Sequence, residues 1–299
     1  MTGWTDRLSA VARDWLPAEI AASWIELFRP AARLVPGGDG QRVGQLGGSP
    51  SLPVEAEWPK WPEVGPLTFI AEVDCAALPR ETLDIPLPER GRLLFFYFDG
   101  RYQVDHDDPY LDPAEPQWAQ GARVVFVPAG VPTSERPAPA GLRPYPRVDL
   151  TTELMATAPQ QEHHLLEQVR LGTGLSLTGA IEDVRVGDQD GPDVFDELIY
   201  RADPHGPRHR IGGFADPVQG PVEQEIAALV LDGVPWDDPR HVQEAARWVL
   251  LAQFDSHDFG TGDDEMMMWG DAGSLYWLIP RDDLAAGRFD AARFTMQCG

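Results

Sequence analysis

"WVLLAQFD", residues 248–255, is the stretch that decides the fold of this protein. A similar segment, LTFIAEVD, occupies residues 67–74. Both segments end in the pattern Ala-x-x-Asp, so that Asp74 aligns with Asp255. Apolar runs of this length that end in turn residues are typical of buried strands. The two segments therefore predict two buried strands with alike surroundings.

Two further pairs of segments repeat in the same order around this stretch. QLGGSPSLP (45–53) matches RIGGFADPV (210–218), and GRLLFFYF (91–98) matches GSLYWLIP (273–280). Each half thus supplies a Gly-Gly turn, a buried strand, a loop and another buried strand. Such a unit exposes an apolar sheet face that cannot stand alone, so we predict a duplicated unit whose two halves pack together.

Other patterns place elements around the repeat. Apolar residues at three- and four-residue spacing predict helix over residues 4–28, interrupted at Pro17 and ending at Pro30. A third strand is expected over residues 122–130 and a last edge strand at the C-terminus. We predict an α+β fold with a mixed or antiparallel sheet, divided as follows: N-terminal helices 1–30, first half 43–131, proline-rich connection 132–160, second half 161–299.

Charge and cysteine content limit the class of protein. The chain of 299 residues carries 48 acids and 24 bases, a net charge of −24, which disfavours nucleic acids and anionic membranes as partners. This charge predicts either a basic protein partner or a purely solubilising surface. Two cysteines, no signal peptide and no window of about 20 apolar residues lead us to expect a cytoplasmic protein.

Several motifs of known chemistry are missing from the sequence. No Gly-Lys pair, G-x-S-x-G, H-E-x-x-H or C-x-x-C occurs, which excludes the usual phosphate loop, nucleophile elbow and zinc motifs. The acidic loop 188–197 has its glycine at the wrong position for an EF-hand. We expect no catalytic residue from these patterns and no required cofactor.

The loop DSHDFGTGDDE, residues 255–265, offers the best oxygen donors for a divalent cation. Calcium and magnesium prefer oxygen ligands, and crowded carboxylates repel one another without a cation. The alternative is a solvated acidic loop. A Ca²⁺ or Mg²⁺ site there would use these residues: Asp255, His257, Asp258, Asp263 and Asp264.

The segment MWGDAG, residues 268–273, has the composition of a tight turn into a buried strand. Gly270 and Gly273 permit positive φ, Asp271 can cap the turn, and Trp269 can pack over it. The Gly-Gly pairs of the repeat predict similar turns. The expected structural turn residues are Gly47, Gly48, Gly212, Gly213, Gly270 and Gly273.

A protein built from two related halves has a seam between them, where ligands commonly bind. Polar residues at the strand ends point to that seam. As an alternative to a protein-binding function, we expect an enzyme or small-ligand site there, with these candidates: Asp74, Gln253, Asp255, Trp269 and Asp271. Each of the two aligned aspartates could instead bind backbone N–H groups in its own turn.

The repeated blocks, with MMWGDAGSLYWLI and the terminal FTMQC, resemble the YwqG-like family of bacterial proteins over residues 44–298. This resemblance implies an intracellular α+β protein and transfers no catalytic residue. Two features depart from the family pattern: a longer loop at residues 259–262, and Glu72 where glutamine is expected. The sequence therefore favours a non-catalytic binding or interaction protein, in one version an immunity- or antitoxin-like partner of a basic protein.

Overall fold

The first helices of the protein form where the amphipathic pattern predicts them. In the computed structural model, α1 (Asp6–Trp15) and α2 (Ala18–Ile25) flank the break at Pro17. The structure describes residues 5–100, 120–184, 194–203, 209–260 and 266–299. Within these ranges no helix combines the length and the apolar character required to cross a lipid bilayer.

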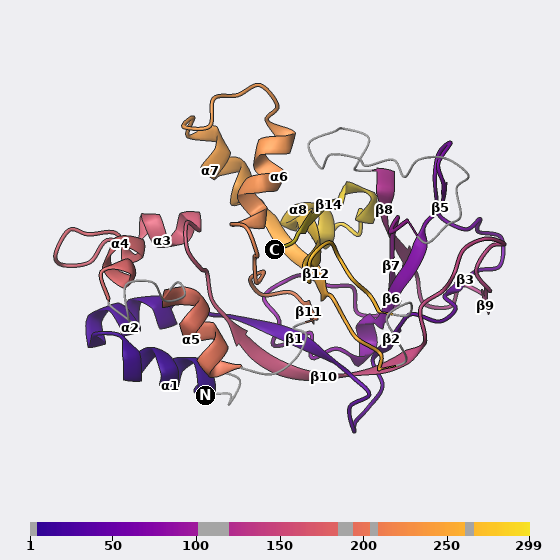
Figure 1. The fold of residues 1–299 in the computed structure, drawn as a ribbon, viewed down its shortest axis with the longest axis horizontal. Helices are drawn as coiled ribbons and strands as arrows, with labels where there is room; N and C mark the ends of the chain where they lie inside the picture. The colour runs from indigo at the N-terminus through magenta and orange to yellow at the C-terminus, as the bar shows by residue number, and fades with distance from the viewer. Residues whose placement is uncertain (1–4, 101–119, 185–193, 204–208, 261–265) are drawn as a thin grey trace.

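One large sheet organises the described parts of the chain, and its ten strands are all paired antiparallel (Figure 1). The order is β14-β13-β12-β11-β1-β10-β2-β6-β7-β8. Its strands are β1 (Arg29–Pro36), β2 (Gly44–Leu46), β6 (Thr68–Asp74), β7 (Arg92–Tyr97), β8 (Ala122–Val127), β10 (Val148–Thr157), β11 (Arg210–Ile211), β12 (Trp248–Asp255), β13 (Ser274–Pro280) and β14 (Arg293–Gln297).

The strands expected from apolar runs are confirmed as β6, β7, β8, β12 and β13, and β14 is the expected edge strand. The two central strands, β1 and β10, were not predicted. Pro30 was expected to end the N-terminal helix, and no strand was expected after it. The prolines of β1, Pro30 and Pro36, lie near its ends and leave the residues between them free to pair. β10 falls inside the range expected to be a connection, because its alternating polar pattern lacks an apolar run.

The pairing in the two outer parts of the sheet follows the same scheme. Ala71 of β6 lies opposite Leu46 of β2, and Ala252 of β12 lies opposite Ile211 of β11. Each long strand has a register irregularity just before that alanine. Residues 67–74 and 248–255 therefore occupy corresponding positions on either side of the β1–β10 centre.

Aromatic side chains fill the space where the curved sheet brings its outer strands together. The ring of Phe95 on β7 lies 5.1 Å from Phe254 on β12 and 5.2 Å from Trp277 on β13. Phe126 on β8 stacks at 4.7 Å on Phe289 of the turn η4 (Phe289–Ala291). These side chains therefore belong to one hydrophobic core that connects the two outer parts of the sheet.

Helices cover the sheet in two groups. One group packs with α1 and α2 around a separate apolar cluster, and in the other group α6 contacts β13 and β14 while α8 contacts β13. The stretch after residue 188, expected as a polar loop, becomes helical at Val194. The remaining helices are α3 (His164–Gln168), α4 (Leu177–Glu182), α5 (Val194–Ala202), α6 (Val222–Val230), α7 (Arg240–Ala245) and α8 (Arg281–Ala285).

Short elements complete the first half of the chain. Strand β3 (Ser51–Pro53) pairs with β9 (Thr133–Glu135), and β4 (Lys60–Trp61) pairs with β5 (Gly65–Pro66). The turn η1 (Cys75–Ala77) follows β6. The β3–β9 pair contacts β7, because the guanidinium of Arg92 donates to the hydroxyl of Thr133 on β9.

Candidate functional site

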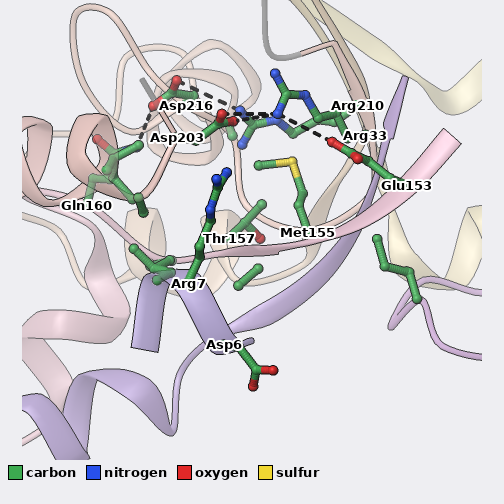
Figure 2. A pocket seen from close by; sticks show the side chains of 17 residues that line it. Asp6, Arg7, Arg33, Glu153, Met155, Thr157, Gln160, Asp203, Arg210 and Asp216 are labelled. Atoms are coloured by element: carbon green, nitrogen blue, oxygen red, sulfur yellow. Dashed lines mark hydrogen bonds and ion pairs between the residues drawn. The ribbon is translucent and has the colours of Figure 1, made fainter. Parts of the chain in front are cut away.

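A cavity of about 260 Å³ opens between the helices α1 and α5 and the centre of the sheet (Figure 2). Strands β1, β10 and β11 and the loop after the second Gly-Gly pair form its other walls. A second cavity of about 460 Å³ shares Ile199 and Asp216 with the first, so the two adjoin at these residues. The apolar walls of the first cavity include Leu8, Leu154, Met155, Ala156, Ile199 and Ala202.

Arg33 of β1 links the sheet to helix α5 at the edge of the first cavity. Its Nη1 lies 3.0 Å from Oδ1 and 2.9 Å from Oδ2 of Asp203, and 3.4 Å from Oε1 of Glu153 on β10. The Arg33–Asp203 pair is mostly buried, while Glu153 is exposed. A mostly buried, charge-assisted hydrogen bond of this kind holds both side chains in position.

Asp216 stands at the junction of the two cavities, and two neighbouring side chains contact its carboxylate. Gln160 Nε2 donates to its Oδ1 at 2.7 Å, and the guanidinium of Arg210 lies 3.8 Å from its Oδ2. Arg210 also donates from Nη1 to the carbonyl of Phe214 at 3.1 Å. Figure 2 shows these side chains converging from β11, from the loop after β10 and from the loop after the Gly-Gly turn.

A partly buried chain of polar groups continues from Asp216 along the second cavity. The backbone N–H of Asp216 donates to Gln253 Oε1 at 2.9 Å, and Gln253 Nε2 donates to Asp255 Oδ1 at 2.7 Å. Ser274 donates its hydroxyl to the same Oδ1 at 2.8 Å, and Tyr276 donates its hydroxyl to the carbonyl of Asp216 at 2.8 Å. Of the predicted candidates, Gln253 and Asp255 therefore belong to one network beside the cavities.

His209 supports this network from inside the protein. Its Nδ1 accepts the backbone N–H of Asp255 at 3.0 Å, and its side chain is fully buried. Burial lowers the pKa of His209 to about 4, because the charged imidazolium loses its hydration. Since Nδ1 accepts a hydrogen bond, the proton of the neutral ring lies on Nε2, which has no hydrogen-bond partner within the described residues.

We expect the protein to lose stability in mild acid through His209. The folded pKa of about 4 is below the unfolded value of 6.5, so between these pH values the unfolded chain binds a proton that the folded protein does not. The contribution is fully present above pH 6.5 and declines toward pH 4, by about 3 kcal/mol at most. Urea denaturation of the wild type and of His209→Gln across this pH range measures the loss. The difference between their free energies of unfolding gives the contribution of His209.

The comparison removes the effects of other buried titratable groups, which both proteins share. The free energy of unfolding of His209→Gln should fall less steeply with acidification than that of the wild type. Parallel slopes for the two proteins would contradict the assigned burial effect.

Glu72 of β6 makes contacts that parallel those of Gln253 on β12. The backbone N–H of Ser51 donates to Glu72 at 3.2 Å, as that of Asp216 does to Gln253. Arg92 occupies the position of Ser274, and its guanidinium binds Glu72 Oε1 and the hydroxyl of Thr133 on β9 at 3.0 Å each. In position, Glu72 corresponds to Gln253 and Arg92 corresponds to Ser274. The β3–β9 pair lies where the second cavity lies beside Ser274.

The other predicted ligand candidates lie outside the two cavities. Asp74 accepts the backbone N–H of Ala76 at 2.9 Å and caps the short 3₁₀ helix η1, so it binds the local backbone. Trp269 is buried in the core. The side chain of Asp271 is exposed, and its backbone carbonyl accepts the N–H of Gly299 at 3.1 Å.

Five of the six predicted turn glycines have positive φ, and Gly273 does not. A β-carbon on Gly273 would lie 2.0 Å from the carbonyl oxygen of Gln297. The requirement at Gly273 is therefore close approach of strand β14 and not backbone conformation, which corrects the expectation. The positive-φ glycines are Gly47, Gly48, Gly212, Gly213 and Gly270.

The predicted cation loop is only partly within the described residues. Asp263 and Asp264 lie outside them, as does Glu265. Asp258 accepts the backbone N–H of Gly260, and His257 exchanges two backbone hydrogen bonds with Met267. No group of three or more potential metal-binding side chains occurs among the residues that the structure describes.

Most residues of the two cavities were not predicted from the sequence. Arg33, Asp203 and Gln160 come from segments with no recognised motif, and they meet only in three dimensions. Arg210 and Asp216 flank the second Gly-Gly turn, so the repeat itself was the one signal that could have identified them.

Comparison with known proteins gives a family without an assigned activity. A family model described as "Domain of unknown function (DUF1963)" matches residues 44–298. This range includes both Gly-Gly turns, both polar networks and most of the cavity lining, whereas α1 and β1 lie before it. No curated protein matches the chain.

Proposed function

Because the chain belongs to the DUF1963 family of unknown function, we propose its role from the geometry of the site: the two adjoining cavities bind a small, positively charged organic ligand. Pockets that combine apolar walls with a few fixed polar groups are the usual form of small-molecule sites. The single observation that carries the proposal is the excess of acidic groups around the joined cavities.

Carboxylates outnumber guanidinium groups in the described lining by three. The acids are Asp6, Glu153, Asp196, Asp203, Asp216 and Asp255, and the bases are Arg7, Arg33 and Arg210. Arg33 and Arg210 each lie against an aspartate of the same lining. A cation is therefore favoured over an anion, and the apolar walls suit an aliphatic chain between charged ends.

The test is binding of small organic cations to the full chain. We expect agmatine, cadaverine or spermidine to raise the melting temperature and to give heat in calorimetry, while glutarate does neither. Asp216→Asn should weaken binding about tenfold, because Asp216 lines both cavities and an ionised partner strengthens a hydrogen bond. The control is Asp149→Asn, a surface aspartate paired with Arg147 outside both linings.

Two results would contradict this role. One is the absence of any melting shift with every cation in the panel. The other is equal binding of glutarate and the diamines, which would show that the acidic lining does not select charge. Circular dichroism of both variants verifies that they are folded.

A second proposed role is contact with a basic protein partner. The net charge of −24 supports it, since complementary charge speeds encounter between proteins. The YwqG-like resemblance implies an intracellular bacterial protein, and in this proposal the protein binds its partner in the cytoplasm without catalysing a reaction. The immunity- or antitoxin-like version would use the acidic surface to mask that partner.

We also infer that the two halves arose by duplication. The support is the matching strand order about β1 and β10, the matching register of β6 and β12, and the matching hydrogen bonds of Ser51 and Asp216. In one copy, the ion pair of Glu72 and Arg92 then fills the space beside the strands. In the other copy, Gln253 and Ser274 leave a cavity there. Duplication thus explains why only one half would bind a ligand.

A further inference from the structure

Helix α6 carries an apolar stripe that is longer than the surface it covers. Val222 and Ile226 are buried against strands β12 and β13, in a cluster with Trp248, Tyr276 and Leu278. Leu229 and Val230 continue the same stripe at helical spacing, but they are 43% and 46% exposed. Within the part of the chain that the structure describes, no element covers the apolar face of the last turn of α6.

The end of the α6–α7 hairpin adds further exposed apolar groups. Figure 1 shows this hairpin projecting from the body of the protein, with its connecting loop at the far end. Trp236 in that loop is 67% exposed, the most of any large hydrophobic residue in the described chain, and Val242 on α7 is 40% exposed. Exposed tryptophan is enriched at the centre of protein interfaces.

The charge left on the hairpin tip is negative. Asp232 and Asp237 are exposed in the connecting loop. The arginines of the hairpin already have acidic partners, since Arg240 binds Asp238 at 2.8 Å and Arg247 binds the carboxylate of Glu244 at 2.8 Å. An apolar surface edged by uncompensated acids is complementary to an amphipathic segment with basic side chains.

We propose that the hairpin tip binds a basic amphipathic segment of another protein. The hairpin tip is defined by Leu229, Val230, Trp236 and Val242, with Asp232 and Asp237 at its edge. This inference rests on the second proposed role and gives it a place on the surface. A second copy of the chain is a poorer occupant, because pairing two tips would bring their like charges together.

The test uses a labelled synthetic helix with leucine on one face and lysine on the other. Its control peptide carries glutamate in place of each lysine. We expect the lysine peptide to bind the wild-type chain, and the doubly substituted Val230→Ser/Trp236→Ala to bind it about tenfold more weakly, as loss of a hot spot does. The control variant is Val54→Ser/Val131→Ser, which removes two exposed valines elsewhere and should bind like the wild type.

The outcomes separate this inference from the role on which it rests. If the lysine peptide binds both double variants equally, a basic segment is bound but not at the hairpin tip, and the inference fails alone. If the lysine peptide does not bind the wild type, or the glutamate peptide binds as well, both fail. If Trp236→Ala dissolves a wild-type dimer seen by sedimentation, the occupant is a second copy and the inference is overturned.

Discussion

Replacing Phe95 with alanine should lower the free energy of unfolding by about 3–5 kcal/mol, the range for truncating a buried phenylalanine. Phe95 is fully buried and belongs to β7, yet its ring packs on Phe254 and Trp277 from the other half of the chain. The substitution therefore leaves a cavity at the contact that holds the curved sheet together. Urea denaturation followed by tryptophan fluorescence measures the change.

Two control substitutions test whether the cost comes from the lost volume at this buried contact. Phe95→Leu keeps most of the volume and should cost about 1 kcal/mol. Tyr200→Ala removes an aromatic ring that is 57% exposed and should change stability by about 0.5 kcal/mol or less. A cost below 1 kcal/mol for Phe95→Ala would show that the two halves do not depend on this contact.

Gly273→Ala should cost about 3 kcal/mol, because the added methyl group has no space. It would lie 2.0 Å from the backbone carbonyl oxygen of Gln297, so strand β14 or the start of β13 must shift. Ser274 follows directly and donates to Asp255 at the second cavity. We therefore expect the variant to weaken binding of a cationic ligand as well as to lower the unfolding midpoint in urea.

Gly40→Ala is the matched control for this substitution. Its methyl group would meet only Thr151, at 3.6 Å, which is ordinary contact, and its backbone is not in the left-handed region. Stability close to that of the wild type is expected there. A Gly273→Ala protein as stable as Gly40→Ala would mean that β13 and β14 tolerate separation at this point.

The different surroundings of Glu72 and Gln253 support the proposed ligand site. Both halves orient a polar side chain toward the backbone after the Gly-Gly turn, through Glu72 in one and Gln253 in the other. In the first half, Arg92 satisfies the charge of Glu72 from within the protein. In the second half, the neutral Gln253 and the small Ser274 leave Asp216 and Asp255 lining a cavity.

The sequence by itself determined the local elements of this protein. Apolar runs predicted β6, β7, β12 and β13, since a strand buried on both faces must be apolar throughout. The order of repeated blocks also placed the two Gly-Gly turns at corresponding points. These features depend on neighbouring residues along the chain, and a linear pattern records them directly.

Only the tertiary structure decided where the halves meet and where a cavity remains. The centre of the sheet consists of β1 and β10, which pair although they lie more than a hundred residues apart in the sequence. The prolines of β1 and the polar residues of β10 do not form a pattern that predicts strands. The cavity depends on Arg33, Asp203 and Asp216, which are brought together by helix α5 and the loop after β11. No local pattern encodes these contacts, because burial and charge pairing are set by the fold as a whole.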